Sequence, residues 1–110
     1  MPKYMVLGSY TSESWTRMVE NPGDRSAVAR KACEDVGGHL EAFYWAFGPD
    51  DFVAIADVPD DASAAAVSVG VSSSGALHNV HTVKLITMEE AQAMLGKAKN
   101  VAAGYRRPGT

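Results

Sequence analysis

Three histidines are the side chains best suited to carry protons near neutral pH. His39 stands two residues before Glu41, and His78 stands three residues before His81. A carboxylate beside an imidazole can orient the ring or raise its basicity, so His39 and Glu41 form a candidate acid–base pair. If residues 78–81 formed a helix, His78 and His81 would lie on one face of it and could bind a metal together. At the entrance to a strand, residues three apart point to opposite faces, so we expect no metal site there.

Aromatic side chains gather in the stretch that follows His39. Tyr44 and Trp45 are suited to line a flat pocket for an apolar or aromatic molecule. The competing interpretation is that these rings pack in the core or in a subunit interface. The candidate ligand-binding residues are therefore Tyr44 and Trp45. The candidate catalytic residues are His39, Glu41, His78 and His81.

Other reactive motifs are missing from the sequence. The lone cysteine, Cys33, has no neighbouring cation and no CxxC partner, so we expect an inert core residue. Gly8 and Ser9 do not form a phosphate-binding loop, because neither GxGxxG nor GxxxxGK[ST] is present. Asp50 and Asp51 are explained by turn chemistry. The sequence therefore predicts no bound metal and no cofactor.

The hydrophobic pattern predicts the elements that position these residues. We expect strands over residues 3–10, 40–47, 51–58 and 80–86, and helices over 25–36, 62–71 and 88–99. A short helical turn over 12–19 follows the potential cap Thr11. Asn21 and Pro22 have the composition of a helix start, and residues 87–90 have the spacing of a capping box.

This order of elements is that of the ferredoxin-like split βαβ fold, an α+β architecture. Four antiparallel strands are covered on one face by two helices, and the helix over 88–99 is additional. The second and fourth strands lie on opposite edges, about 14 Å apart at the usual strand spacing. Within one chain, His39 and Glu41 therefore cannot reach His78 or His81. Only the assembly of two sheets would bring them together.

Large apolar side chains on both faces of the second strand point to a partner. Phe43, Trp45 and Phe47 are expected on one face, and Leu40 and Tyr44 on the other. A single layer of helices covers only one of these faces. We therefore expect the uncovered face to meet a second copy of the chain, as a homodimer or a higher homo-oligomer.

The length and charge of the chain set further limits. The 110 residues fit one domain, which we place at 1–99 with a tail over 100–110. The net charge is −3 and no helix carries a basic stripe, so we expect no nucleic-acid partner. No apolar run is long enough to cross a bilayer, and no signal sequence begins the chain, so we expect a cytoplasmic protein without a membrane partner.

Two segments carry a resemblance to a known family. The opening KYMVLGSYT and the stretch from AFYWAFGPDD to VHTVKLIT resemble the GYD domain family, over roughly residues 3–95. The hairpin turn and the Ala-rich helix after the sequence PDD are the most specific part. The resemblance implies a ferredoxin-like fold of the dimeric α/β-barrel type and brings no catalytic residues. The family motif Gly-x-Tyr-Asp reads GPDD here, with Asp50 in place of the tyrosine.

Two functions of different classes follow from these observations. The first is a protein that binds or transforms a small apolar or aromatic molecule in a pocket between the open sheet face and the helices. The second is a structural or regulatory homo-oligomerisation module without catalysis, whose aromatic residues seal a subunit interface. A buried pocket empty of convergent polar groups would favour the second function, whereas a small molecule that co-purifies with the protein would favour the first.

Overall fold

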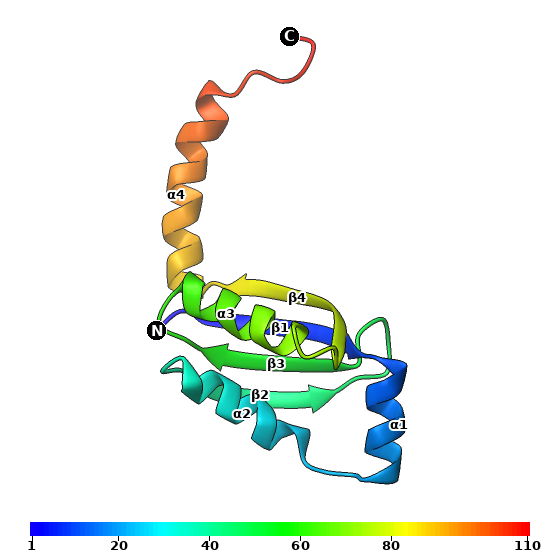
Figure 1. Cartoon of the computed structure of the whole chain (residues 1–110). Coiled ribbons are helices and arrows are strands. Elements are labelled where there is room, and N and C mark those ends of the chain that lie inside the picture. Colours follow the sequence, from blue (N-terminus) through cyan, green and yellow to red (C-terminus); the bar gives the residue numbers. More distant parts are fainter.

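Two helices cover one face of a four-stranded antiparallel sheet in the computed structural model, which describes residues 1–110 (Figure 1). This arrangement confirms the predicted α+β architecture. The elements follow the order β1 (Lys3–Tyr10), α1 (Ser12–Glu20), α2 (Arg25–Asp35), β2 (His39–Trp45), β3 (Phe52–Asp57), α3 (Asp61–Ser72), β4 (Leu77–Leu85) and α4 (Met88–Gly104).

The strand order is β2-β3-β1-β4, so β1 and β3 form the centre of the sheet and β2 and β4 form its edges. β1 pairs antiparallel with both β3 and β4, and β3 pairs antiparallel with β2. The prediction that the second and fourth strands lie on opposite edges is therefore confirmed. The sheet is open, and a barrel would need a second chain.

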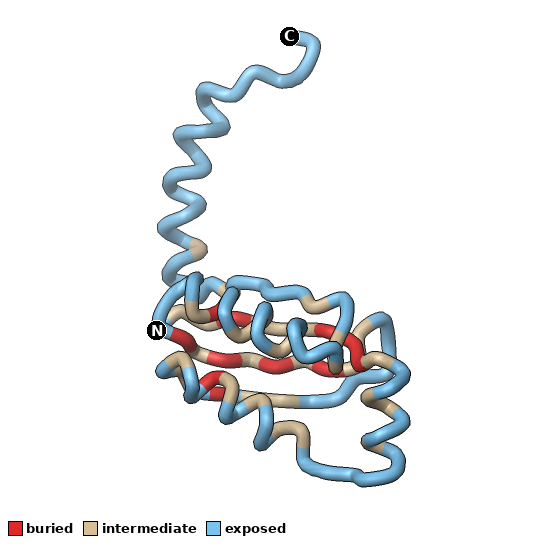
Figure 2. Tube along the Cα trace, viewed as in Figure 1, coloured by how far each residue is buried: buried red, intermediate tan, exposed pale blue.

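The core lies between the sheet and the helices α2 and α3. Only 11 of 110 residues are buried, and Figure 2 shows that most of them follow the central strands. The core is thin because α3 contributes mainly alanine and valine side chains to it. The buried apolar residues are Tyr4, Tyr10, Cys33, Leu40, Phe52, Ala54, Ala56, Val58 and Ala64.

A β-bulge in β2 changes which side chains face the helices. Leu40 pairs with Ala56, but Ala42 pairs with Ile55, so Glu41 is an extra residue in the strand. Such an insertion reverses the alternation of side chains beyond it. Leu40 and Phe43 therefore both pack in the core, and their expected placement on opposite faces is wrong.

Phe47 is the second correction to the expected strand. β2 ends at Trp45, and Phe47 lies in the connection to β3, fully exposed to solvent. The connection turns at Gly48, where the chain returns towards β3. Phe47 consequently shares no sheet face with Phe43 and Trp45.

The start of α2 also differs from the expectation. Asp24 is the N-cap, and its carboxylate accepts a hydrogen bond from the backbone N–H of Ser26 at 3.0 Å. Asn21 instead ends α1, where its N–H donates to the carbonyl of Arg17. Asp is as effective an N-cap as Asn, so the residue directly before the helix takes the role.

α4 stands away from the sheet as an arm (Figure 1). It begins with the predicted capping box, in which Thr87 and Glu90 each accept a hydrogen bond from the other's backbone N–H. The helix continues to Gly104, five residues beyond the expected end at 99. Along it only Ala91 is partly buried. No helix in the chain has the length and apolar character needed to span a bilayer.

Candidate functional site

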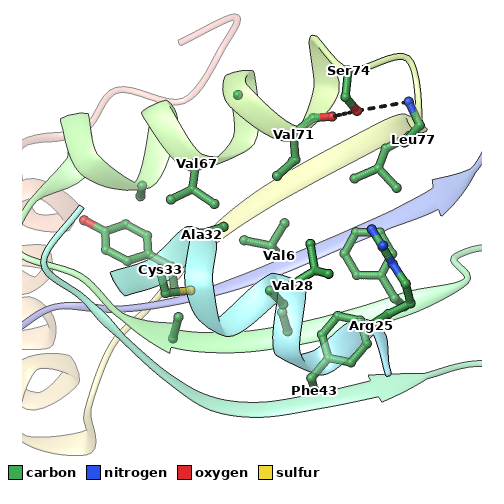
Figure 3. A pocket seen from close by; sticks show the side chains of 18 of the residues that line it. Val6, Arg25, Val28, Ala32, Cys33, Phe43, Val67, Val71, Ser74 and Leu77 are labelled. Atoms are coloured by element: carbon green, nitrogen blue, oxygen red, sulfur yellow. Dashed lines mark hydrogen bonds between the residues drawn. The ribbon is translucent and has the colours of Figure 1, made fainter. Parts of the chain in front are cut away.

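An apolar pocket of about 440 Å³ lies between the sheet and the helices α2 and α3 (Figure 3). Of its 20 lining residues, 17 are hydrophobic. Its volume falls in the range of roughly 300 to 1,000 Å³ that is usual for small-molecule sites. The pocket exists because α2 packs mainly over β2 and α3 mainly over β4, which leaves a gap between the two helices above the central strands.

Small side chains on α3 form one wall of the pocket. Ala64, Val67, Gly70 and Val71 face the cavity from successive turns of this helix. A methyl group added at Gly70 would meet no atom within 4 Å. The wall therefore leaves space that larger side chains would fill.

The opposite wall is the apolar stripe of α2, and the floor is the central part of the sheet. Val28, Ala32 and Cys33 line the pocket from α2 (Figure 3). Burial raises the pKa of the Cys33 thiol, which keeps it protonated and weakly reactive. The expected inert character of this cysteine agrees with its surroundings.

Tyr4 lies in the floor of the pocket and is only 4 % exposed. Its hydroxyl donates to a carboxylate oxygen of Asp61, at the start of α3. This hydrogen bond, together with desolvation, raises the pKa of Tyr4 to about 12. The hydroxyl is thus already engaged and points out of the pocket's apolar interior.

An aromatic cluster lies next to the pocket at the α1 end of the sheet. Trp45 donates from its indole Nε1 to the hydroxyl of Tyr10 at 3.1 Å, and the two rings pack edge to face. Trp15 packs edge to face on both of these rings. Tyr10 and Phe52 line the pocket, whereas the candidate ligand residue Trp45 lies behind Tyr10 and does not.

The other candidate ligand residue, Tyr44, lies on the far side of the sheet. Tyr44 pairs with Val53, which in turn pairs with Leu7. These positions alternate with pocket-lining residues of β1 and β3, so their side chains point away from the helices. We call this surface the open face; it comprises Met5, Leu7, Tyr44, Val53, Ile55, His81 and Val83.

The candidate pair His39 and Glu41 lies on edge strand β2, and no hydrogen bond joins the two side chains. The Glu41 carboxylate instead accepts a hydrogen bond from Lys3. Lys3 also contacts Asp57, at 3.0 Å. These two carboxylates raise the pKa of the Lys3 ammonium, with the Glu41 hydrogen bond the larger cause. Glu41 therefore belongs to a surface ion-pair network.

The two remaining histidines, His78 and His81, lie on the opposite edge strand, β4. His81 pairs with Leu7 and His78 pairs with Ser9, and these two partners share one face of β1. His78 and His81 consequently share the open face, so their expected placement on opposite faces is wrong. The cause is a bulge at Asn79, whose φ of 54° lies in the left-handed region.

Neither candidate pair, His39 with Glu41 or His78 with His81, belongs to a group of side chains that could hold a metal ion. His81 Nε2 lies 3.8 Å from Asp50 Oδ1, in the connection between β2 and β3. No group of three or more His, Cys, Asp or Glu side chains converges anywhere in the chain. β3 and β1 separate the two edge strands, so the structure does not bring the four candidate catalytic residues together.

Sequence reasoning missed the residues that line the pocket, including Arg25, Val28 and Val67. The available signal was the composition of residues 62–71, where alanine, valine and glycine predominate. A helix with such small side chains does not fill the space above a sheet whose floor includes Phe52 and Tyr4. The spacing of the two helices was not visible in the sequence.

Comparison with known protein families matches residues 4–95 to the GYD domain. The chain belongs to the GYD domain family. All residues that line the pocket fall inside the GYD domain match. A Thermus thermophilus relative is named glutamine synthetase and cystathionine beta-lyase binding protein. It is 30 % identical to this GYD domain over 89 residues, which cover 81 % of this chain and 87 % of the relative.

Proposed function

We propose that the protein binds a small apolar molecule in the pocket between the sheet and the helices α2 and α3. The observation that carries this proposal is the cavity of about 440 Å³ with 17 hydrophobic residues among the 20 that line it. An unfilled apolar cavity of this size costs stability, because its lining forgoes dispersion contacts that a guest would supply.

Binding is a better assignment than catalysis for this pocket. None of the three histidines lines it. The hydroxyl of Tyr4 is committed to Asp61, and the Cys33 thiol has a raised pKa. A nucleophile needs an adjacent base within hydrogen-bond reach, and the lining offers no such pair.

Cys33 provides a direct test, because it is the only cysteine of the chain and it lines the pocket. We expect an apolar guest such as decanoate to slow the reaction of Cys33 with a thiol reagent, and to bind measurably by calorimetry. Val67→Trp should obstruct the cavity and weaken both effects. Val69→Trp is the matched control, since Val69 is exposed on the same helix and does not line the pocket. Equal binding by the Val67→Trp variant and the wild type would contradict the proposal.

The second candidate function is protein association. We infer that the open face pairs with a second copy of the chain to give a dimeric α/β barrel. Met5, Leu7, Val53 and Ile55 form a continuous apolar surface by their register. Light scattering at micromolar concentration tests this inference, and a monodisperse monomer would refute it.

α4 supports association with a different protein. A helix of 17 residues that is exposed along almost its whole length is marginally stable in water, so a partner that covers it would stabilise it. Met88, Leu95 and Val101 offer such a partner exposed apolar side chains. The name of the Thermus relative suggests the class of partner, a metabolic enzyme such as glutamine synthetase or cystathionine beta-lyase. Sedimentation of the protein with each purified enzyme tests this candidate, with a chain that ends at Thr87 as the control.

A further inference from the structure

Arg25 is the only charged residue among those that line the apolar pocket. It is the first residue of α2, and Figure 3 places it at one end of the cavity beside Phe43. Cys33 lies towards the other end, eight residues further along the helix, which corresponds to about 12 Å. The pocket is therefore apolar along its length and positively charged at one end.

The guanidinium of Arg25 has no carboxylate partner within the chain. None of the six ion pairs in the structure includes it. Its Nε is buried, and no acceptor of the chain receives a hydrogen bond from it. Because the chain itself covers Nε, a ligand oxygen would meet the guanidinium at its terminal amino groups, which make no hydrogen bond to the chain.

The neighbouring acid does not serve as that acceptor. The carboxylate of Asp24 accepts hydrogen bonds from both the backbone N–H and the hydroxyl of Ser26. These bonds lower the pKa of Asp24 and hold its side chain on the first turn of α2. Arg25 also borders an exposed depression between α1 and α2, which contains Arg17 and Glu20. The charged end of the pocket thus adjoins the surface of the protein.

We propose that the pocket accepts an amphipathic organic anion, with its carboxylate on Arg25 and its apolar part along α2 towards Cys33. This inference rests on the proposed small-molecule site and names its ligand class. A guanidinium binds a carboxylate through two parallel hydrogen bonds, a geometry that a neutral head group does not match. The positive end of the α2 dipole favours a negative charge at the same place.

Calorimetric titration with decanoate and with 1-decanol tests separately whether the pocket binds an apolar molecule and whether Arg25 binds its carboxylate. We expect the wild type to bind decanoate, and Arg25→Met to weaken that binding by about tenfold or more. Binding of 1-decanol should be the same in both proteins. Arg25→Lys should fall between them, since it keeps the charge and loses the planar fork. Arg30→Met is the matched control, because Arg30 is exposed on α2 and does not line the pocket.

The outcomes distinguish the ligand class from the site itself. Equal affinity of the wild type and the Arg25→Met variant for decanoate overturns the role of Arg25, whereas the pocket proposal stands. If the wild type binds 1-decanol and not decanoate, the anion inference is wrong. If neither probe binds or slows the labelling of Cys33, the pocket proposal is wrong as well. Circular dichroism of each variant confirms that it is folded.

Discussion

Tyr4 and Asp61 join β1, one of the two central strands, to the first turn of α3 through one hydrogen bond. Lys84 on β4 contacts the same carboxylate oxygen of Asp61 at 3.1 Å. The hydrogen bond from Tyr4 and the contact with Lys84 lower the pKa of Asp61. One carboxylate therefore fixes the position of α3 over two strands, and α3 is a wall of the pocket.

The first prediction concerns the pH dependence of this contact. The folded-state pKa of Tyr4 is raised to about 12, so its contribution to stability is complete below the ordinary tyrosine pKa near 10 and is lost as the pH rises through about 12. Ultraviolet titration should show a tyrosine ionisation near pH 12 that Tyr4→Phe removes and Tyr44→Phe retains. A wild-type titration complete well below that pH would contradict the hydrogen bond.

At acidic pH, Asp61 gives the opposite dependence. Its folded-state pKa is lowered, so its contribution is present above the unfolded value of 3.8 and disappears as the pH falls through the folded pKa. Asp61→Asn should therefore lower the melting temperature at neutral pH. In acid, the difference in melting temperature between this variant and the wild type should become smaller. Thermal melting of both proteins across this pH range measures the effect. A constant difference at all pH values would exclude this role of the Asp61 charge.

Gly38 is predicted to be intolerant of any side chain. A Cβ there would lie 2.6 Å from the carbonyl oxygen of Asp57 and 2.7 Å from a methyl of Val58, which is too close for either. Gly38→Ala should lower the free energy of unfolding by about 1–3 kcal/mol, the usual cost of overpacking. Gly48→Ala is the control, because nothing lies within 4 Å of its added methyl. Urea denaturation of the two variants compares them.

A charge on the open face should weaken self-association. Tyr44 is 68 % exposed within one chain, so Tyr44→Asp leaves the monomer core untouched. In a face-to-face dimer the same aspartate would be buried without a partner, at a cost of several kcal/mol. Sedimentation equilibrium should show a loss of the oligomer for this variant and not for Val19→Asp, on the exposed side of α1. If the Tyr44→Asp variant still forms the oligomer, the interface is not on the open face.

Substitution of the histidines should leave ligand binding unchanged. His39, His78 and His81 lie on edge strands and outside the pocket lining. Separate alanine variants should bind decanoate with wild-type affinity in the calorimeter. A strong loss of affinity in any one of these variants would show that this histidine contributes to the site. Such a contribution would require an assembled dimer, in which a histidine of one copy reaches the pocket of the other.

The alternation and capping signals in the sequence were sufficient to predict most of the fold. Alternation placed β1, and the spacing of Thr87 and Glu90 identified the start of α4. The β2 bulge was not predictable from alternation, because it is a shift in the register with β3, and the partner of Glu41, Lys3, is distant in the sequence. The pocket was missed for a related reason: it depends on the separation of two helices rather than on a motif. For this reason, the sequence indicated only that Arg25 begins a helix and did not indicate that it lines a pocket.

The bulges in β2 and β4 affect how copies of the chain can associate through their edge strands. An edge strand with regular, unpaired backbone groups can form hydrogen bonds with the edge strand of another chain, and this edge-to-edge pairing can continue without limit. The irregular residues at Glu41 and Asn79 interrupt that template on both outer strands. The dimer proposed for the open face would instead use the same surface on each copy and would be complete after two chains. The bulges thus disfavour edge-to-edge growth into filaments without blocking such a closed dimer.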